Sequence, residues 1–149
     1  MNSLYLLALF VPLAMSTAPI TSQINKPIAG GQFTYYDAVG NGACGEPLKK
    51  CTAALSAKLF DPAAKWGPSP KDASKYVLQD PACNDLCVKI EYKGKTASFP
   101  IQDKCPGCEP NHVDLSEDAF KVLESNLGVG KATPATITYL PCSQTKISC

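Results

Sequence analysis

The chain has little net charge, a single histidine and only one long apolar run. Its 14 Lys and Arg residues nearly balance its 13 Asp and Glu residues, which leaves a formal net charge of +1. A charge this small creates no strong electrostatic field, so we expect neither nucleic acid nor an anionic membrane as a partner. The sequence also has no Asn-x-Ser/Thr site with a permitted middle residue, so N-linked glycosylation is not expected.

The apolar run lies at the N-terminus. Residues 1–22 carry no charged side chain and contain the run Leu4–Met15, which is too short to span a bilayer but suits a secretory signal. The small residues Ala14 and Ser16 predict cleavage after Ser16, so residues 1–16 are expected to be a signal peptide. We therefore expect a secreted, extracellular protein that is soluble and has no membrane partner.

The remainder, about 130 residues, suffices for one domain with its own core and is too short for two of ordinary size. Residues 17–30 contain Pro19, Pro27 and a terminal glycine, which predicts a flexible lead-in. The domain is expected over residues 31–149, as a monomer.

Eight cysteines are an even number in a chain bound for an oxidising compartment, so four disulfides are expected. They are Cys44, Cys51, Cys83, Cys87, Cys105, Cys108, Cys142 and Cys149. Two alternatives stay open. Cys83-x3-Cys87 followed by Cys105-x2-Cys108 approximates a zinc-ribbon spacing, and Cys105 with Cys108 alone could be a redox pair. Because secretion and four further cysteines argue against zinc, no metal and no cofactor is expected.

Alternating apolar and polar residues predict a mainly β fold. Strands are expected at residues 32–37, 53–56, 87–92, 96–102 and 135–140. The clearest hairpin turns at Lys93-Gly94, and period-two alternation carries Asp103 to the same side as Phe99 and Ile101. Residues 61–80 give no clear assignment. Trp66 within them is either a sugar-stacking side chain or a half-buried packing residue.

One helix is predicted, beginning at Asp114 or Ser116 and ending before Gly128, with an apolar stripe on one face. The stripe consists of Ala119, Phe120, Leu123 and Leu127. The glycine-rich segment 40–45 predicts a tight loop whose backbone lies close to another strand or to a ligand.

Two carboxylates and the histidine converge on residues 101–116. Asp103 and Asp114 flank a turn that holds two cysteines, and His112 precedes Asp114 closely. Because carboxylic acids protonate glycosidic oxygens and carboxylates hold sugar hydroxyls, this segment indicates a saccharide site. The structural alternative is that Asp103 ends a strand and Asp114-x-x-Glu117 forms a helix capping box.

Six motifs spread over most of the chain are informative as a set. They are Gly31-Gln-Phe-Thr-Tyr-Tyr-Asp37, Gly42-Ala-Cys-Gly45, Ala54-Leu-Ser-Ala-Lys-Leu-Phe-Asp61, Gly94-Lys95, Asp103-Lys-Cys-Pro-Gly-Cys108 and Val113-Asp-Leu-Ser-x-x-Ala-Phe120. Together they resemble the secreted double-psi β-barrel proteins, above all the single-domain expansin-related proteins called loosenins, with barwin-like and rare lipoprotein A-like proteins as wider relatives. The resemblance implies a six-stranded double-psi β-barrel with one or two short helices and an open polysaccharide groove.

The resemblance also implies site residues. Thr34, Asp103 and Asp114 would line the groove, the two aspartates at catalytic positions, and Tyr36, Asp37 and His112 would contact substrate. Family-45 glycoside hydrolases, which share the barrel, use the Asp equivalent to Asp114 as general acid and a second Asp near the position of Asp37 as base. By analogy with barwin, Cys87 is expected to pair with Cys142.

These observations favour a secreted, non-hydrolytic protein that binds and loosens cell-wall polysaccharide, such as cellulose, another glucan, chitin or peptidoglycan. Hydrolysis needs a matched acid and base, and a base partner for Asp114 is not secured. Two alternatives stay open. One is a disulfide-rich module that binds a secreted or host protein, as a protease inhibitor or effector does, and the other is an endoglucanase or lytic transglycosylase.

Overall fold

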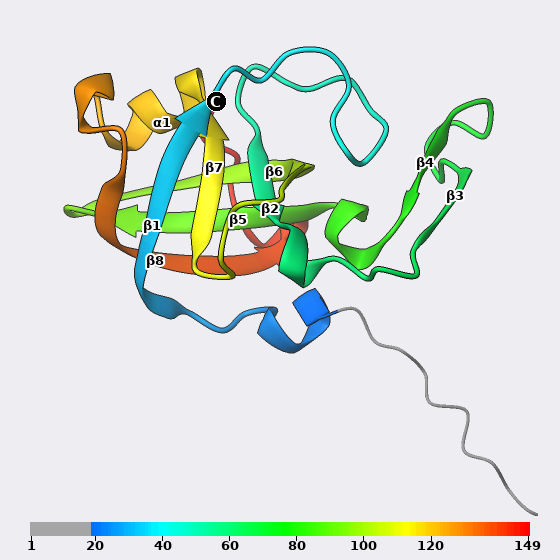
Figure 1. Ribbon diagram of the computed structural model, residues 1–149, viewed down its shortest axis with the longest axis horizontal. Coiled ribbons are helices and arrows are strands. Elements are labelled where there is room, and N and C mark those ends of the chain that lie inside the picture. The colour runs from blue at the N-terminus through cyan, green and yellow to red at the C-terminus, as the bar shows by residue number, and fades with distance from the viewer. Residues whose placement is uncertain (1–18) are drawn as a thin grey trace, which may run out of the picture.

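The computed structural model of the protein describes residues 19–149, which form a closed six-stranded barrel with a two-stranded hairpin at one end (Figure 1). The strands of the barrel follow the order β1-β7-β2-β6-β5-β8. Their bounds are β1 Ile28–Tyr36, β2 Ala53–Ser56, β5 Leu86–Tyr92, β6 Lys95–Cys105, β7 His112–Ser116 and β8 Ala132–Pro141. The predicted mainly β, six-stranded barrel is confirmed, whereas the expected signal peptide lies outside the described residues.

The remaining elements are short. The hairpin consists of β3 Lys65–Pro68 and β4 Tyr76–Gln79, within the segment that the sequence left unassigned. The described residues contain one α-helix, α1 Glu117–Leu123, and the 3-10 helices η1 Pro19–Gln23, η2 Ala57–Leu59, η3 Pro81–Cys83, η4 Leu127–Val129 and η5 Cys142–Gln144. Within this part of the chain, no helix has the length and apolar character needed to cross a bilayer.

Two parallel strand pairs define the barrel. β1 pairs with β7 and β2 pairs with β6 in parallel, while the other neighbours are antiparallel. Parallel neighbours cannot be joined by a tight turn, so the chain must cross over between them. The crossovers bring residues that are distant in the sequence into register, such as Thr34 with Asp114 and Ala54 with Asp103.

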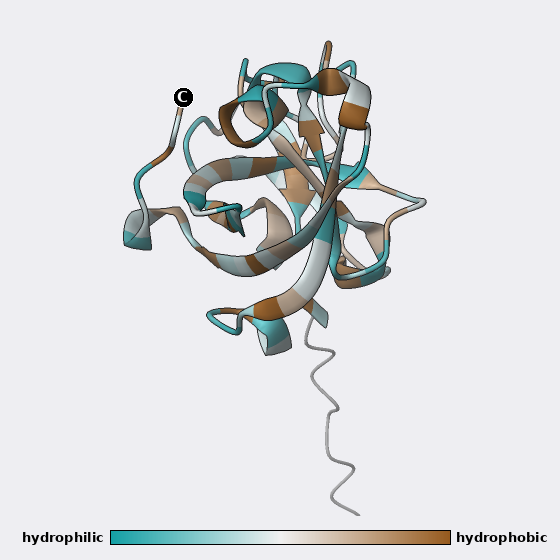
Figure 2. Ribbon diagram, turned by 90° about the vertical axis from the view of Figure 1, so that its left-hand side faces the viewer, coloured by the Kyte–Doolittle hydropathy of each residue, from teal (hydrophilic) through white to brown (hydrophobic). Residues whose placement is uncertain are grey.

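The core fills the barrel with alternate residues of its strands, which Figure 2 shows as bands of contrasting hydropathy along the ribbon. Phe33 lies fully buried, with ring centroids 5.1 Å from both Tyr92 and Phe120. Ala97, Phe99 and Ile101 are buried together, as their alternation predicted. The predicted turn is also present, since Lys93 and Gly94 both have positive φ, as a tight hairpin requires.

The lead-in prediction for residues 17–30 is wrong from Pro19 onward. Ile20 is fully buried, Asn25 N donates to the Tyr139 carbonyl at 2.8 Å, and β1 already begins at Ile28. Apolar residues between Pro19 and Pro27 make these contacts. The prolines and glycine of the segment had suggested a loop without such packing.

The helix begins at the second of the two predicted positions, since Ser116 is its N-cap, but it ends earlier than the apolar stripe predicted. Ser116 caps α1 through its side chain, so Asp114 lies on β7 and forms no capping box. The helix ends at Leu123, and a separate 3-10 turn carries Leu127 and Gly128. Asp114 therefore needs an explanation other than capping.

All eight cysteines form disulfides. The pairs are Cys44–Cys83, Cys51–Cys149, Cys87–Cys142 and Cys105–Cys108. The pairing of Cys87 with Cys142 that the barwin resemblance implied is confirmed, and the zinc-ribbon alternative is wrong because its four cysteines are bonded to other sulfur atoms.

Candidate functional site

Three polar side chains lie in register across neighbouring strands. Thr34 of β1 pairs with Asp114 of β7, Asp114 pairs with Ala54 of β2, and Ala54 pairs with Asp103 of β6. We call Thr34, Asp114 and Asp103, with Ala54 between the two aspartates, the polar row. Because neighbouring strands lie about 4.8 Å apart, the aspartate Cα atoms are separated by roughly 9 to 10 Å.

The polar row faces away from the core. Phe33 and Val113, which precede Thr34 and Asp114, are buried in the barrel, so alternation turns Thr34 and Asp114 to the other face. Thr34, Asp103 and Asp114 are all half-buried, whereas Ala54 is only 2% exposed. Two partly accessible carboxylates therefore flank a small apolar residue.

Asp103 is fixed by three hydrogen-bond donors. Its Oδ1 accepts from the backbone N–H of Ala43 at 2.8 Å and of Lys104 at 2.9 Å. Its Oδ2 accepts from the Tyr36 hydroxyl at 2.8 Å. Since an ionised carboxylate has about four acceptor positions, Asp103 has little capacity left to activate a water molecule.

Asp114 ends a short hydrogen-bond chain. The Thr34 hydroxyl donates to Asp114 Oδ1 at 2.8 Å, and His112 Nε2 lies 2.8 Å from the same hydroxyl. While the single proton of the Thr34 hydroxyl is donated to an ionised Asp114, His112 Nε2–H is the donor to Thr34. The chain from His112 through Thr34 thus fixes the orientation of the Asp114 carboxyl.

Burial shapes the protonation of this chain. It raises the pKa of Asp114, against the opposing effects of the Thr34 hydrogen bond and of His112. Burial likewise lowers the pKa of His112, which favours the neutral imidazole. A carboxyl that retains its proton more readily than usual is suited to donating a hydrogen bond or a proton.

Tyr36 joins the row from the end of β1. Its hydroxyl reaches Asp103 on β6, a strand that is not a neighbour of β1, and burial followed by the Asp103 hydrogen bond raises its pKa. Tyr35 points to the other side, where its ring packs on Phe120 and its hydroxyl donates to the Leu127 carbonyl. Alternation along β1 thus sends the two adjacent tyrosines to opposite faces of the strand.

The structure brings together five of the six predicted site residues. They form two hydrogen-bonded groups, His112–Thr34–Asp114 and Tyr36–Asp103, along the polar row. Asp37 is exposed beyond the end of β1 and outside the polar row. Its predicted role stays a prediction.

The contribution of the glycine-rich loop was only partly foreseen. A side chain at Gly42 would overlap the carbonyl oxygen of Gln102, so this loop lies directly against β6. The close approach to another strand that its glycines predicted is confirmed. The sequence did not reveal that Ala43 N would hold Asp103, although the same glycines were the available signal.

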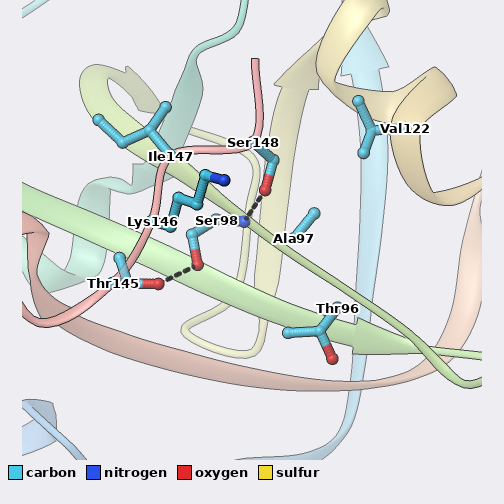
Figure 3. Close-up of a pocket in the computed structure, with 8 residues that line it drawn as sticks. All are labelled: Thr96, Ala97, Ser98, Val122, Thr145, Lys146, Ile147 and Ser148. Atoms are coloured by element: carbon cyan, nitrogen blue, oxygen red, sulfur yellow. Dashed lines mark hydrogen bonds between the residues drawn. The ribbon is translucent and has the colours of Figure 1, made fainter.

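A hollow of about 470 Å³ lies elsewhere, between β6, α1 and the C-terminal tail (Figure 3). There the Ser98 backbone N–H donates to Ser148 Oγ at 2.9 Å, and the hydroxyls of Ser98 and Thr145 are hydrogen-bonded at 2.7 Å. Lys146 is the single ionisable side chain among the residues that line it. This hollow therefore lacks an acid–base pair, and the polar row is the better candidate site.

Comparison with known proteins gives three relatives of different kinds. The chain is 37% identical over 114 residues, 76% of its length, to the papain inhibitor of Streptomyces mobaraensis and covers 72% of that protein. The solved Streptomyces papain inhibitor matches with a TM-score of 0.63 and 31% identity, over 78% of this chain and 96% of the other. Expansin-like protein 5 of Dictyostelium discoideum is 31% identical over 121 residues, covering 72% of this chain and 42% of that protein.

The similarity to a solved expansin structure supports the fold alone. A mutant Clavibacter michiganensis expansin, solved in complex with cellohexaose, matches with a TM-score of 0.54 and 23% identity, over 74% of this chain and 49% of that one. No protein-family model matches the chain.

The closed barrel, its two parallel pairs and its four disulfides define a small double-psi β-barrel protein. The chain belongs to the expansin-related family of these barrels, which the papain inhibitor and expansin-like relatives represent.

Proposed function

We propose that the protein is a secreted, non-hydrolytic binding protein for cell-wall polysaccharide. The observation that carries this proposal is the polar row, with Thr34, Asp114 and Asp103 aligned across adjacent strands and half-exposed. Carboxylates and hydroxyls at this spacing are suited to successive hydroxyl groups of a sugar chain. Four disulfides are typical of proteins that work in an oxidising, extracellular compartment.

Binding without cleavage follows from the two carboxylates. Asp114 is suited to act as an acid, but inverting hydrolysis also needs a second carboxylate that activates water. Asp103 already accepts three hydrogen bonds and is a poor candidate for that base. The bound chain would then be held and displaced from its neighbours, and its glycosidic bonds would remain intact.

The experiment combines polymer binding with a test for cleavage. Purified protein would be incubated with cellulose, chitin and peptidoglycan, and both retention and released reducing sugar would be measured. Asp114→Asn should weaken retention about tenfold. Hydrogen bonds to charged groups contribute about 1.5 to 3 kcal/mol, and a value at the low end is expected because the Asp114 carboxylate is partly exposed. The matched control is Asp118→Asn on the exposed face of α1, which should bind like wild type.

Two results would contradict the proposal. Retention on none of the polymers would remove the binding function. A steady release of sugar that Asp114→Asn abolishes would instead indicate a hydrolase or lytic transglycosylase.

A second candidate, inhibition of a papain-like cysteine protease, is favoured by the similarity to the papain inhibitor over most of both chains. A stable disulfide-linked barrel is a suitable scaffold for such binding. Titration of papain with the purified protein tests it: loss of peptidase activity at stoichiometric protein, unchanged in Asp114→Asn, would support inhibition over polysaccharide binding.

A further inference from the structure

The hairpin β3–β4 carries two exposed aromatic side chains. Trp66, the single tryptophan of the chain, is 55% exposed, and Tyr76 is 63% exposed. Trp66 pairs with Leu78 and Tyr76 pairs with Pro68, so the two aromatic residues are diagonal neighbours on the same face. Large apolar side chains exposed side by side commonly mark a binding surface.

The indole is held in place by the glycine-rich loop. A Cβ at Gly45 would lie 2.6 Å from Trp66 Cζ3 and 2.9 Å from the Tyr76 carbonyl oxygen, so only glycine allows this contact. The Leu78 N–H donates to the Cys44 carbonyl at 3.1 Å, and the Cys44–Cys83 disulfide secures the same loop. An aromatic side chain fixed in this way loses little conformational entropy when it binds a ligand.

The aromatic surface lies near the Asp103 end of the polar row. Ala43, which donates to Asp103, is only two residues from Gly45, which contacts Trp66. Two residues of extended chain span about 7 Å at most. A ligand lying along the row and passing Asp103 would therefore reach the indole.

The charges of the segment that holds the hairpin balance, since residues 61–80 contain three lysines and three aspartates. Lys71 contacts Asp85 at 2.7 Å, and Lys75 lies 3.7 Å from Asp72. The surface around the aromatic pair thus favours a neutral ligand with apolar faces, which describes the sugar rings of an uncharged polysaccharide.

We infer that Trp66 and Tyr76 form a stacking subsite for a neutral polysaccharide chain, extending the polar row at the Asp103 end. This inference rests on the proposed polysaccharide function. The hairpin within residues 61–80 would then bind the part of a polysaccharide chain that extends beyond the polar row.

The single tryptophan makes the subsite directly observable. Soluble oligomers of glucose and of N-acetylglucosamine, of increasing length, would be titrated into the wild-type protein while Trp66 emission and binding heat are recorded. Long oligomers should shift the emission to shorter wavelength, because stacking removes the indole from water. Short oligomers that fill only the row should bind without this shift.

Variants separate the two parts of the site. Trp66→Ala should lower the affinity for long oligomers at least fivefold, because a central aromatic contact is lost. The affinity for short oligomers should not change. Trp66→Phe should retain most of the affinity and shows whether the hairpin still folds. Asp114→Asn should lower the affinity for both long and short oligomers. Val122→Ala lies on α1, at the opposite end of the molecule from the hairpin (Figure 1), and should change neither affinity.

The possible outcomes test the stacking subsite separately from the proposed polysaccharide binding. If long oligomers bind in an Asp114-dependent way but neither Trp66 emission nor the Trp66→Ala affinity changes, the subsite is refuted and the proposed function stands. Binding of no oligomer and no polymer refutes both. If Trp66→Ala abolishes inhibition of papain and leaves oligomer affinity unchanged, the aromatic surface is a protein contact and the inference is wrong.

Discussion

Gly42 is the residue whose replacement best tests how the loop holds Asp103. A Cβ at this position would overlap the Gln102 carbonyl oxygen and approach Leu48 Cδ2 to 2.6 Å. Gln102 belongs to β6, and its carbonyl also accepts from Cys44 N at 3.3 Å. Because the barrel strand cannot yield easily, Gly42→Ala must displace the loop.

The cost follows from the bonds that the displaced loop would lose. The bond from Ala43 N to the Asp103 carboxylate is charge-assisted, at about 1.5 to 3 kcal/mol, and the bond from Cys44 N to Gln102 is neutral, at about 0.5 to 1.5 kcal/mol. Loss of both predicts a destabilisation of about 2 to 4.5 kcal/mol. For a domain of this size, that lowers the melting temperature by about 10 °C.

Thermal unfolding followed by circular dichroism would measure this effect. The matched control is Gly107→Ala, because a Cβ at Gly107 meets no other atom within 4 Å, and its melting temperature should stay within about 3 °C of wild type. If Gly42→Ala melts together with this control, the loop is not held against β6 as described and its role in fixing Asp103 is refuted.

Three further predictions follow. Burial raises the pKa of Asp114, so the folded state binds this proton more tightly than the unfolded chain and stability falls as pH rises through the carboxyl range. Asp114→Asn should therefore melt above wild type at pH 7 and together with it at pH 3; a higher melting temperature of wild type at pH 7 would contradict this. Replacing Cys87 and Cys142 by serine opens a loop with a sequence separation of 55, which should lower the free energy of unfolding by about 4 kcal/mol in urea titrations. Tyr36→Phe removes one donor from Asp103, so polymer retention should weaken about threefold while the fold is preserved, and unchanged retention would exclude Tyr36 from the site.

Local patterns predicted the parts of the fold that neighbouring residues decide. The hairpin about Lys93-Gly94 follows from alternation and turn chemistry, and the eight cysteines required four disulfides in an oxidising compartment. The sequence did not predict where the helix ends, because the apolar stripe continues to Leu127. In the structure, the backbone becomes extended at Glu124 and the helix stops there. The packed segment from Pro19 was missed because Ile20 finds its burial only against distant parts of the chain.

The polar row shows the limit of local reasoning most clearly. Alternation could turn Thr34 outward, but nothing near it indicates that Asp114, 80 residues later, would be its strand partner. The resemblance to expansin-related barrels supplied that association before the register was known. It also selected Cys87 with Cys142 from many pairings.

By itself, the sequence determined the β-strand periodicity, the tight turn, the number of disulfides and the residue types available for a saccharide site. Only the tertiary structure decided that Asp114 is a strand residue, that Asp103 accepts from three donors and that Gly45 lies against Trp66. The physical reason is that side-chain direction repeats over two or a few residues, whereas the alignment of distant strands depends on closing the whole barrel.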